Sequence, residues 1–388
     1  MSELATLVER AEELSYDLDL ARVKQWKAEH PGRAAVGFLP VWVPREVIHA
    51  AGGLPVGVLG GGDRLEIIRG DACFQSYICH LPRSVTELGM TGRLEILDGM
   101  LFPSICDVIR NLSGIWKILF PQKLVRYLDL PQNFDPKIDG AFFRRELEHL
   151  YENVAKLCGT KPDAKALRAS IVVYNESRAL HRELDALRRK EPWRVPTSEA
   201  YLVVRAGNVL PIEEHNEFLR AYLDLVRSVQ RAPLDNARVV LTGAFCEQPP
   251  LDLIKTLERT GCYIVDDDFL LAPRFLTQDV AVDGDPLENL SLAFCEHAMA
   301  HASVLCKAGT KGDELVAKVR ACQAEGVLFA APSFCDPALL DQPMVQATLD
   351  AHRIPHTSFK YCENTGQFQG IREQTGTFAD AIKLWSEA

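Results

Sequence analysis

The chain has 388 residues, of which 47% are hydrophobic and 25% charged, which is typical of a folded protein and excludes intrinsic disorder. At roughly 100–200 residues per domain, this length allows two or three domains. The formal net charge of −10 argues against a surface for nucleic acid or anionic membranes. No apolar run reaches the length of about 18 residues that a transmembrane helix needs, and the charged segment 1–29 lacks the apolar stretch of a secretory signal. We therefore expect a cytoplasmic protein.

The first elements along the chain alternate between helices and strands. Residues 3–28 have apolar side chains at helical spacing and predict one amphipathic helix. Short apolar runs predict buried strands at 34–43, 53–59 and 95–102. A helix is expected to begin at Pro44, because proline is favoured in the first helical turn. This alternation predicts an α/β protein with a mostly parallel sheet.

The same alternation returns after a long helical stretch. Residues 141–190 are helical by their apolar period, and the segment 191–196, with two prolines, ends that pattern. A helix is expected near 212–230, and four further strands are expected at 237–242, 262–265, 326–331 and 355–361. We therefore predict two α/β domains in tandem, spanning residues 1–195 and 196–388.

The chain contains 11 cysteines, far fewer than a disulfide scaffold of this size would need. No Cys-x-x-Cys pair occurs, which excludes zinc ribbons, thioredoxin-like motifs and ferredoxin-type cluster runs. Most of the cysteines are therefore expected to be small buried hydrophobes.

Some cysteines occupy positions that favour function. Cys106, Cys246 and Cys335 directly follow predicted strands, and two of them share the pattern Pro-Ser-x-Cys-Asp. Ligands bind outside the carboxyl ends of parallel strands, where backbone amides are expected to lower a thiol pKa. Cys79 precedes Arg83 at another loop or helix start. Thiolates from distant segments suit an iron–sulfur cluster at a domain interface, and catalytic zinc is an alternative.

Two other groups of residues are weaker candidates for a metal site. Cys295, His297, His301 and Cys306 lie close in sequence, and the two histidines would share one helix face, although the segment also fits a core helix. The run 266–268, three aspartates after a strand, suits a cation but is more often a solvated strand end.

Three common motifs are missing from the sequence. Residues 52–62 are rich in glycine but do not spell the dinucleotide fingerprint. There is no Gly-Lys dipeptide, so no Walker A loop exists, and any ATP would be hydrolysed by another subunit. The absence of Gly-x-Ser-x-Gly disfavours an α/β-hydrolase.

Over about residues 34–380, a series of motifs resembles one known family. In chain order they are GFLPVWVPREVIHAAGGLPV, CHLPRS, DGMLFPSICD, YNESR, GCYIVDDD, FCDP and TGQFQGIREQTGTFAD. They are similar to the 2-hydroxyacyl-CoA dehydratase / benzoyl-CoA reductase family. The segments QSYICHLPRS, SICDVIRNLSG and FCEQPPLDLIK look most like the C-type (gamma) subunits of its ATP-dependent, class I reductases.

The resemblance implies two Rossmann-like (flavodoxin-like) parallel-sheet domains with additional helices. It also implies a [4Fe-4S] cluster at their junction, held by Cys79, Cys106 and Cys335, with a fourth iron ligand that is not a cysteine of the chain. We assign Cys79 and not the nearby Cys73, because the family's Cys-x-x-x-Arg-Ser wording begins at Cys79.

The resemblance further implies an activity and partners. The expected reaction is the reduction of benzoyl-CoA to cyclohexa-1,5-diene-1-carbonyl-CoA in anaerobic aromatic degradation. The expected partners are a homologous B-type subunit, the A- and D-type ATPase subunits that bind the ATP, and reduced ferredoxin as the electron donor. The alternatives are a subunit of an (R)-2-hydroxyacyl-CoA dehydratase and a non-catalytic, cluster-bearing partner subunit.

Four further residues are candidates for supporting roles. His80, Arg83 and Asp107 are the nearest in sequence for tuning a cluster through charge and hydrogen bonds, with helix-cap or surface roles as the alternative. Glu46, at a predicted helix start that faces a strand end, is a candidate proton donor.

Overall fold

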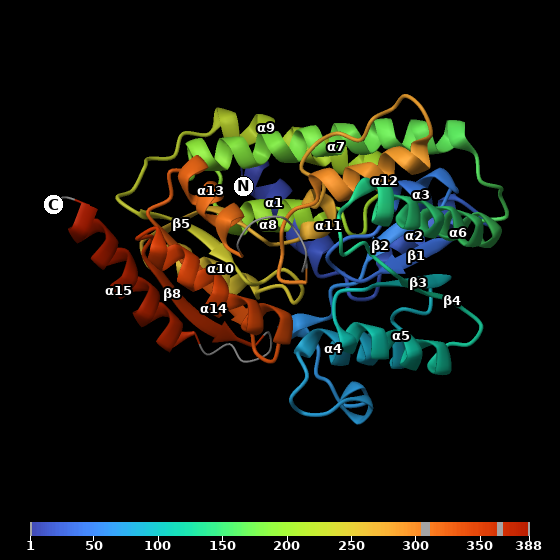
Figure 1. The fold of residues 1–388 in the computed structure, drawn as a ribbon, viewed down its shortest axis with the longest axis horizontal. Helices are drawn as coiled ribbons and strands as arrows, with labels where there is room; N and C mark the ends of the chain where they lie inside the picture. Colours follow the sequence, from blue (N-terminus) through green and yellow to red (C-terminus); the bar gives the residue numbers. More distant parts are fainter. Residues whose placement is uncertain (1, 304–310, 363–367, 387–388) are drawn as a thin grey trace.

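The computed structural model describes residues 2–303, 311–362 and 368–386. Two four-stranded sheets form the centre of the two halves of the molecule, and helices surround them (Figure 1). Every strand pairing within these two sheets is parallel. The predicted α/β class with two Rossmann-like sheets is therefore confirmed.

The two sheets have the same strand order. The first runs β2-β1-β3-β4 and the second β6-β5-β7-β8, which in each case is the 2-1-3-4 arrangement that begins the flavodoxin-like order. The strands are β1 (Ala35–Phe38), β2 (Leu54–Gly57), β3 (Gly99–Pro103), β4 (Leu124–Leu128), β5 (Ala237–Thr242), β6 (Cys262–Asp267), β7 (Gly326–Pro332) and β8 (His356–Tyr361).

Helices connect the strands and cover the sheets. None of them, in the part of the chain that is described, has the length and apolar character needed to span a bilayer. They are α1 (Glu3–Ser15), α2 (Ala21–Glu29), α3 (Arg45–Ala50), α4 (His80–Met90), α5 (Asp107–Leu119), α6 (Ala141–Leu157), α7 (Ala164–Lys190), α8 (Thr197–Ala206), α9 (Ile212–Ser228), α10 (Leu251–Arg259), α11 (Leu271–Arg274), α12 (Pro286–His297), α13 (Asp313–Ala321), α14 (Asp336–Ala351) and α15 (Gln369–Ser386), with short turns η1 (Gly62–Arg64), η2 (Gly70–Cys73) and η3 (Pro136–Gly140).

The secondary structure differs from the sequence-based expectations at α1 and α2 and at β4. The single helix expected over 3–28 is wrong, because the chain turns between α1 and α2, where Leu20 has a φ of 51° and the Asp17 carboxylate accepts the backbone N–H of Arg22 at 3.0 Å. The strand β4 was not expected. It is a half-buried edge strand, so it lacks the continuous apolar run that marks the inner strands.

Helices from each half of the chain cover the other half. The long helix α7 runs across both halves (Figure 1), α1 packs against α8 and α9, and α12 packs against α6. The division at residue 195 stays a prediction.

An aromatic cluster joins the segment after β1 to later helices. The Trp42 ring, 2% exposed, lies with its centroid 5.0 Å from that of Phe294, 5.7 Å from Phe275 and 5.8 Å from Phe143. Phe143 belongs to α6 and Phe294 to α12. Such aromatic pairs stabilise a core beyond the area they bury.

We expect Trp42→Ala to lower the free energy of unfolding by about 3–5 kcal/mol, because it empties the centre of this cluster. The matched control is Ile118→Ala on α5, whose side chain is 80% exposed and whose loss should change stability by less than about 0.5 kcal/mol. Chemical denaturation measures both, and similar effects in the two variants would contradict the packing described.

Two histidines are buried where α7 meets α9. The rings of His181 and His215 lie 5.7 Å apart between centroids, and His215 Nε2 lies 3.0 Å from the carbonyl oxygen of Val203. Burial lowers the pKa of His215 to about 4. Burial and then the neighbouring His215 hold the pKa of His181 well below its usual value. Both rings are therefore neutral in the folded protein near pH 7.

Because these pKa values lie below about 6.5, the value in an unfolded chain, each ring gains its proton only on unfolding. The stability from this pair is present above about pH 6.5 and falls, by up to about 1.4 kcal/mol per pH unit for each ring, as the pH decreases toward the folded pKa. Denaturation of wild type and His215→Gln between pH 7 and 5 tests this. We expect a shallower slope in the variant, and equal slopes would contradict it.

Candidate functional site

The three cysteines predicted to hold a cluster each occupy the N-cap of a helix. Cys79 begins α4, Cys106 begins α5 and Cys335 begins α14. Cys106 follows β3 and Cys335 follows β7, which have the same place in the two identically ordered sheets. The repeated Pro-Ser-x-Cys-Asp pattern thus marks equivalent positions at the carboxyl ends of two strands, where open parallel sheets bind ligands.

The thiols lie close enough to act on one another electrostatically. Burial is the largest influence on Cys79 and raises its pKa well above the usual value, and then Glu247, Cys335 and Cys106 raise it further. Burial raises the pKa of Cys335 to about 12, and Cys106 adds to this increase. The structure therefore brings the three predicted cysteines together from both sheets.

A fourth thiol belongs to the same group. Cys246, in the loop between β5 and α10, is 5% exposed, and after burial the groups that raise its pKa most are Cys335, Cys79 and Cys106. We call these residues, Cys79, Cys106, Cys246 and Cys335, the four-thiol group. In the sequence, Cys246 follows a predicted strand as Cys106 and Cys335 do, but it lacks the Pro-Ser-x-Cys-Asp pattern that those two share.

The expected lowering of the thiol pKa values is wrong. Backbone amides of the first helical turns do favour the thiolate, from Ile109 and Val108 for Cys106 and from Ala338 for Cys335. Burial is the larger influence in both cases, and the pKa of each thiol is raised. The protein alone therefore keeps these thiols protonated near pH 7, and a bound metal centre would be needed to hold them as thiolates.

The donor chemistry of the group suits iron and sulfide. Its donors are soft sulfur atoms, which favour iron–sulfur clusters, zinc or copper. Among residues 2–303, 311–362 and 368–386, no three His, Cys, Asp or Glu side chains are arranged to hold a metal ion. In an iron–sulfur cluster each cysteine binds a different iron atom, so the cysteines lie farther apart than they do around a single metal ion. The arrangement of the four-thiol group is therefore compatible with a cluster.

A buried carboxylate that sequence reasoning missed lies beside Cys79. Glu247, 1% exposed, accepts the backbone N–H of His80 at 2.8 Å and that of Leu81 at 3.4 Å through Oε2. Its backbone carbonyl accepts the hydroxyl of Tyr361, at the end of β8. The position of Glu247 next to Cys246 in a strand-end loop was the only sequence signal for it.

The residues predicted to tune a cluster have different surroundings. His80 is buried, and its backbone donates to Glu247. Arg83 pairs with Asp71 at 3.0 Å. Asp107 is largely exposed and lies 3.5 Å from Arg110. Their roles stay predictions.

Glu46 lies in a buried ion pair. Its carboxylate accepts from the guanidinium of Arg178 on α7, and its backbone carbonyl accepts the hydroxyl of Ser170 at 2.9 Å. This places Glu46 in the contact between α3 and α7. Its role as a proton donor stays a prediction.

The alternative metal site around His297 required both histidines on one helix face, and the helix does not extend that far. The helix α12 ends at His297, so His301 lies beyond it and stacks its ring on Phe245, with centroids 5.4 Å apart. Cys295 is buried within α12, and Cys306 lies outside the described residues.

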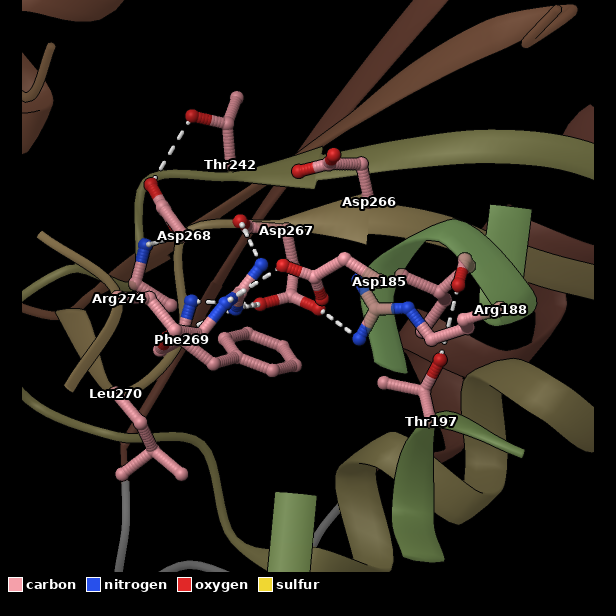
Figure 2. A network of polar contacts seen from close by, with 12 residues as sticks. Asp185, Arg188, Thr197, Thr242, Asp266, Asp267, Asp268, Phe269, Leu270 and Arg274 are labelled. Carbon is pink, nitrogen blue, oxygen red and sulfur yellow. Dashed lines mark hydrogen bonds and ion pairs between the residues drawn. The ribbon is translucent and has the colours of Figure 1, made fainter. Parts of the chain in front are cut away.

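The three aspartates at the end of β6, labelled in Figure 2, are buried and not at a solvated surface, since each is 8% exposed or less. The Asp267 carboxylate lies 2.7 Å from Arg188 and 2.7 Å from Arg274. Asp266 pairs with Arg189 and, at 3.0 Å, with Lys318. The expected solvated strand end is therefore wrong, and these aspartates form a network between β6, α7 and α11 (Figure 2).

The aspartates differ in the direction of their pKa shifts. Burial raises the pKa of Asp267, but Arg188 and Arg274 outweigh burial, so the net pKa is lowered. Burial raises the pKa of Asp268 to about 6; this carboxylate accepts from the hydroxyl of Thr242 at 3.0 Å and the N–H of Gly243 at 2.6 Å. These contacts indicate that the network has a structural role in the core beside the second sheet.

Comparison with known proteins identifies the family. Residues 40–382 match the family described as 2-hydroxyglutaryl-CoA dehydratase, D-component. The chain belongs to this family. It is 54% identical over 383 residues to the C subunit of benzoyl-CoA reductase from Thauera aromatica, covering 98% of this chain and 99% of that protein. It is 27% identical over 384 residues to the beta subunit of (R)-2-hydroxyglutaryl-CoA dehydratase from Acidaminococcus fermentans, covering 98% and 100%.

A third relative has about the same sequence identity to this chain as the dehydratase subunit from Acidaminococcus fermentans. The (R)-phenyllactyl-CoA dehydratase beta subunit of Clostridium sporogenes is 24% identical over 355 residues, covering 91% of this chain and 93% of that protein. The relatives are therefore subunits of enzymes that act on CoA thioesters. These comparisons confirm the family that the motifs indicated, and they confirm the similarity to a C-type subunit of benzoyl-CoA reductase.

We expect Asp267→Asn to destabilise the protein by about 3–5 kcal/mol, because it leaves two buried guanidinium groups without their carboxylate. The control is Asp279→Asn, which breaks the 2.8 Å pair with Arg182 between two half-exposed side chains and should cost about 1 kcal/mol or less. Urea denaturation compares them, and an Asp267→Asn variant as stable as the control would contradict the structural role of the network.

Proposed function

We propose that this chain is the iron–sulfur subunit of the substrate-reducing module of a benzoyl-CoA reductase, with a [4Fe-4S] cluster held by Cys79, Cys106 and Cys335. The observation that carries the proposal is the convergence of these three helix N-caps from both sheets. The 54% identity to the C subunit of a benzoyl-CoA reductase supports the reductase over the dehydratases, whose subunits are 24–27% identical.

The residues around the thiols suit a strongly reducing centre. When bound, such a cluster supplies single electrons at low potential, which an aromatic ring needs because reduction removes its aromatic stabilisation. Cys79 and Cys335 are 7% and 5% exposed, so the fold excludes bulk water from their sulfur atoms. The amides of Val108, Ile109 and Ala338 point toward the sulfurs of Cys106 and Cys335; such hydrogen bonds stabilise added negative charge, so they raise the cluster potential and act against the effect of burial.

The proposal includes partner subunits and an electron donor. A homologous B-type subunit would complete the substrate-reducing module, and A- and D-type ATPase subunits would deliver electrons from reduced ferredoxin in the cytoplasm. The lack of a Walker A loop in this chain fits ATP binding elsewhere. The substrate would be benzoyl-CoA and the product cyclohexa-1,5-diene-1-carbonyl-CoA.

A role in a dehydratase is the second candidate, because three relatives are beta subunits of 2-hydroxyacyl-CoA dehydratases. The two functions differ in their use of ATP. A reductase would hydrolyse ATP in every turnover of benzoyl-CoA, whereas a dehydratase would need ATP only to prime turnover of a 2-hydroxyacyl-CoA. An ATP-to-product ratio measured on the anaerobic complex therefore separates them.

We expect the anaerobically co-expressed complex to carry about four iron and four sulfide ions for this chain, and Cys106→Ala to lose most of them together with the EPR signal of the reduced cluster. The control is Cys158→Ala, a buried cysteine (6% exposed) at the end of α6, which should keep both. Zinc in place of iron, or unchanged iron in Cys106→Ala, would contradict the assignment. Loss of the signal without loss of turnover would instead favour a non-catalytic partner subunit.

A further inference from the structure

A single carboxylate links the second half of the chain to the helix that begins with Cys79. Glu247 lies in the loop between β5 and α10, whereas α4 belongs to the first half. Its Oε2 atom accepts the backbone N–H groups of His80 and Leu81, 2.8 and 3.4 Å away. These are the first two amides of α4, immediately after the proposed iron ligand.

We propose that Glu247 is a positioning residue that fixes the Cys79 end of α4 against the second sheet and keeps the reduction potential of the cluster low. This inference rests on the proposed function, because it requires a cluster on Cys79. It adds a residue that does not ligate iron and acts through the backbone and through its charge.

The positioning role follows from the hydrogen bonds. The first amides of a helix have no partner within the helix, and a carboxylate at this end is favoured by both the free N–H groups and the helix dipole. Hydrogen bonds to a charged acceptor are about twice as strong as neutral ones. Since Cys79 immediately precedes these amides, Glu247 constrains the direction in which the Cys79 sulfur points. The anchor itself is held, because the Glu247 carbonyl accepts the hydroxyl of Tyr361.

The effect on potential follows from the charge. Glu247 is 1% exposed, and charges interact more strongly in a protein interior than in water. The carboxylate is near enough to act on Cys79, Cys246 and Cys335. Reduction adds one electron to a cluster without breaking a bond, and a negative charge nearby disfavours that electron. Glu247 therefore makes the cluster a stronger reductant, as the reduction of an aromatic ring requires.

The test compares midpoint potentials, measured by anaerobic EPR-monitored redox titration of the complex with its sister subunit, after iron and sulfide have been counted. Glu247→Gln keeps an oxygen that can accept the N–H groups but removes the charge, so we expect a positive shift of the midpoint potential. The matched control is Glu258→Gln. Glu258 is a half-buried carboxylate that likewise contacts the start of another helix, α8, accepting the Ser198 N–H at 3.1 Å and the Ser198 hydroxyl at 2.7 Å.

Glu258 lies near the end of α10, which leads into the amino end of β6, at the sheet edge opposite the four-thiol group. We therefore expect Glu258→Gln to keep the wild-type potential. A wild-type potential in an iron-replete Glu247→Gln complex would overturn this inference and leave the cluster assignment intact. Absence of iron and sulfide from the wild-type complex would overturn both.

A second variant covers the case in which Glu247→Gln does not fold or loses its iron. Glu247→Asp keeps the charge but shortens the side chain, so the hydrogen bonds to His80 and Leu81 should weaken. We expect faster hydrogen–deuterium exchange in the first turn of α4 than in the wild type. Because the charge is kept, we expect the midpoint potential to stay close to the wild-type value. Unchanged exchange in that turn would overturn the positioning role.

Discussion

The close approach of four thiols, three of them buried and that of Cys106 half-buried, is the constraint on which the functional interpretation of this structure depends. Cys79, Cys106, Cys246 and Cys335 come from loops at the carboxyl ends of strands in both sheets, or from the helices that follow them. Burial is the main cause that raises the pKa of all four thiols, and neighbouring thiols of the group raise those of Cys79, Cys246 and Cys335 further. A metal centre would stabilise this arrangement, because metal binding removes the protons of the thiols and compensates the negative charge of the resulting thiolates.

The rest of the molecule keeps the two sheets in the relation that this site needs. The helix α7 spans both halves (Figure 1), and its Arg188 pairs with Asp267 at the end of β6. Near the middle of the same helix, Arg178 pairs with Glu46 of α3. One helix is thus tied by a buried ion pair to an element beside each sheet, and Glu247 connects the two halves directly at the site.

Much of the fold could be predicted from the sequence, because its information is local. The inner strands are short apolar runs followed by turn residues, and β5 was expected at the residues where it occurs. The repeated pattern around Cys106 and Cys335 likewise marked two equivalent strand ends. The edge strand β4 was missed because half-buried residues alternate too weakly to mark a strand.

The features that were missed depend on contacts between distant segments. Three consecutive aspartates after a strand were interpreted as a solvated strand end, and only the fold brings Arg188, Arg274 and Lys318 to them. The same holds for Glu247, whose partners lie 166 and 167 positions away along the chain. The sequence also suggested low thiol pKa values from the helix starts, but it could not show how deeply the thiols are buried, and burial decides the direction.

Mössbauer spectroscopy of the anaerobic complex, with isotopically enriched iron in this chain's cluster, tests the central claim most directly. Three cysteine ligands with one position open to another ligand predict two kinds of iron in a ratio of about three to one. Four equivalent, thiolate-bound irons would contradict the account, because they would show that the fourth thiol of the group, Cys246, is also a ligand.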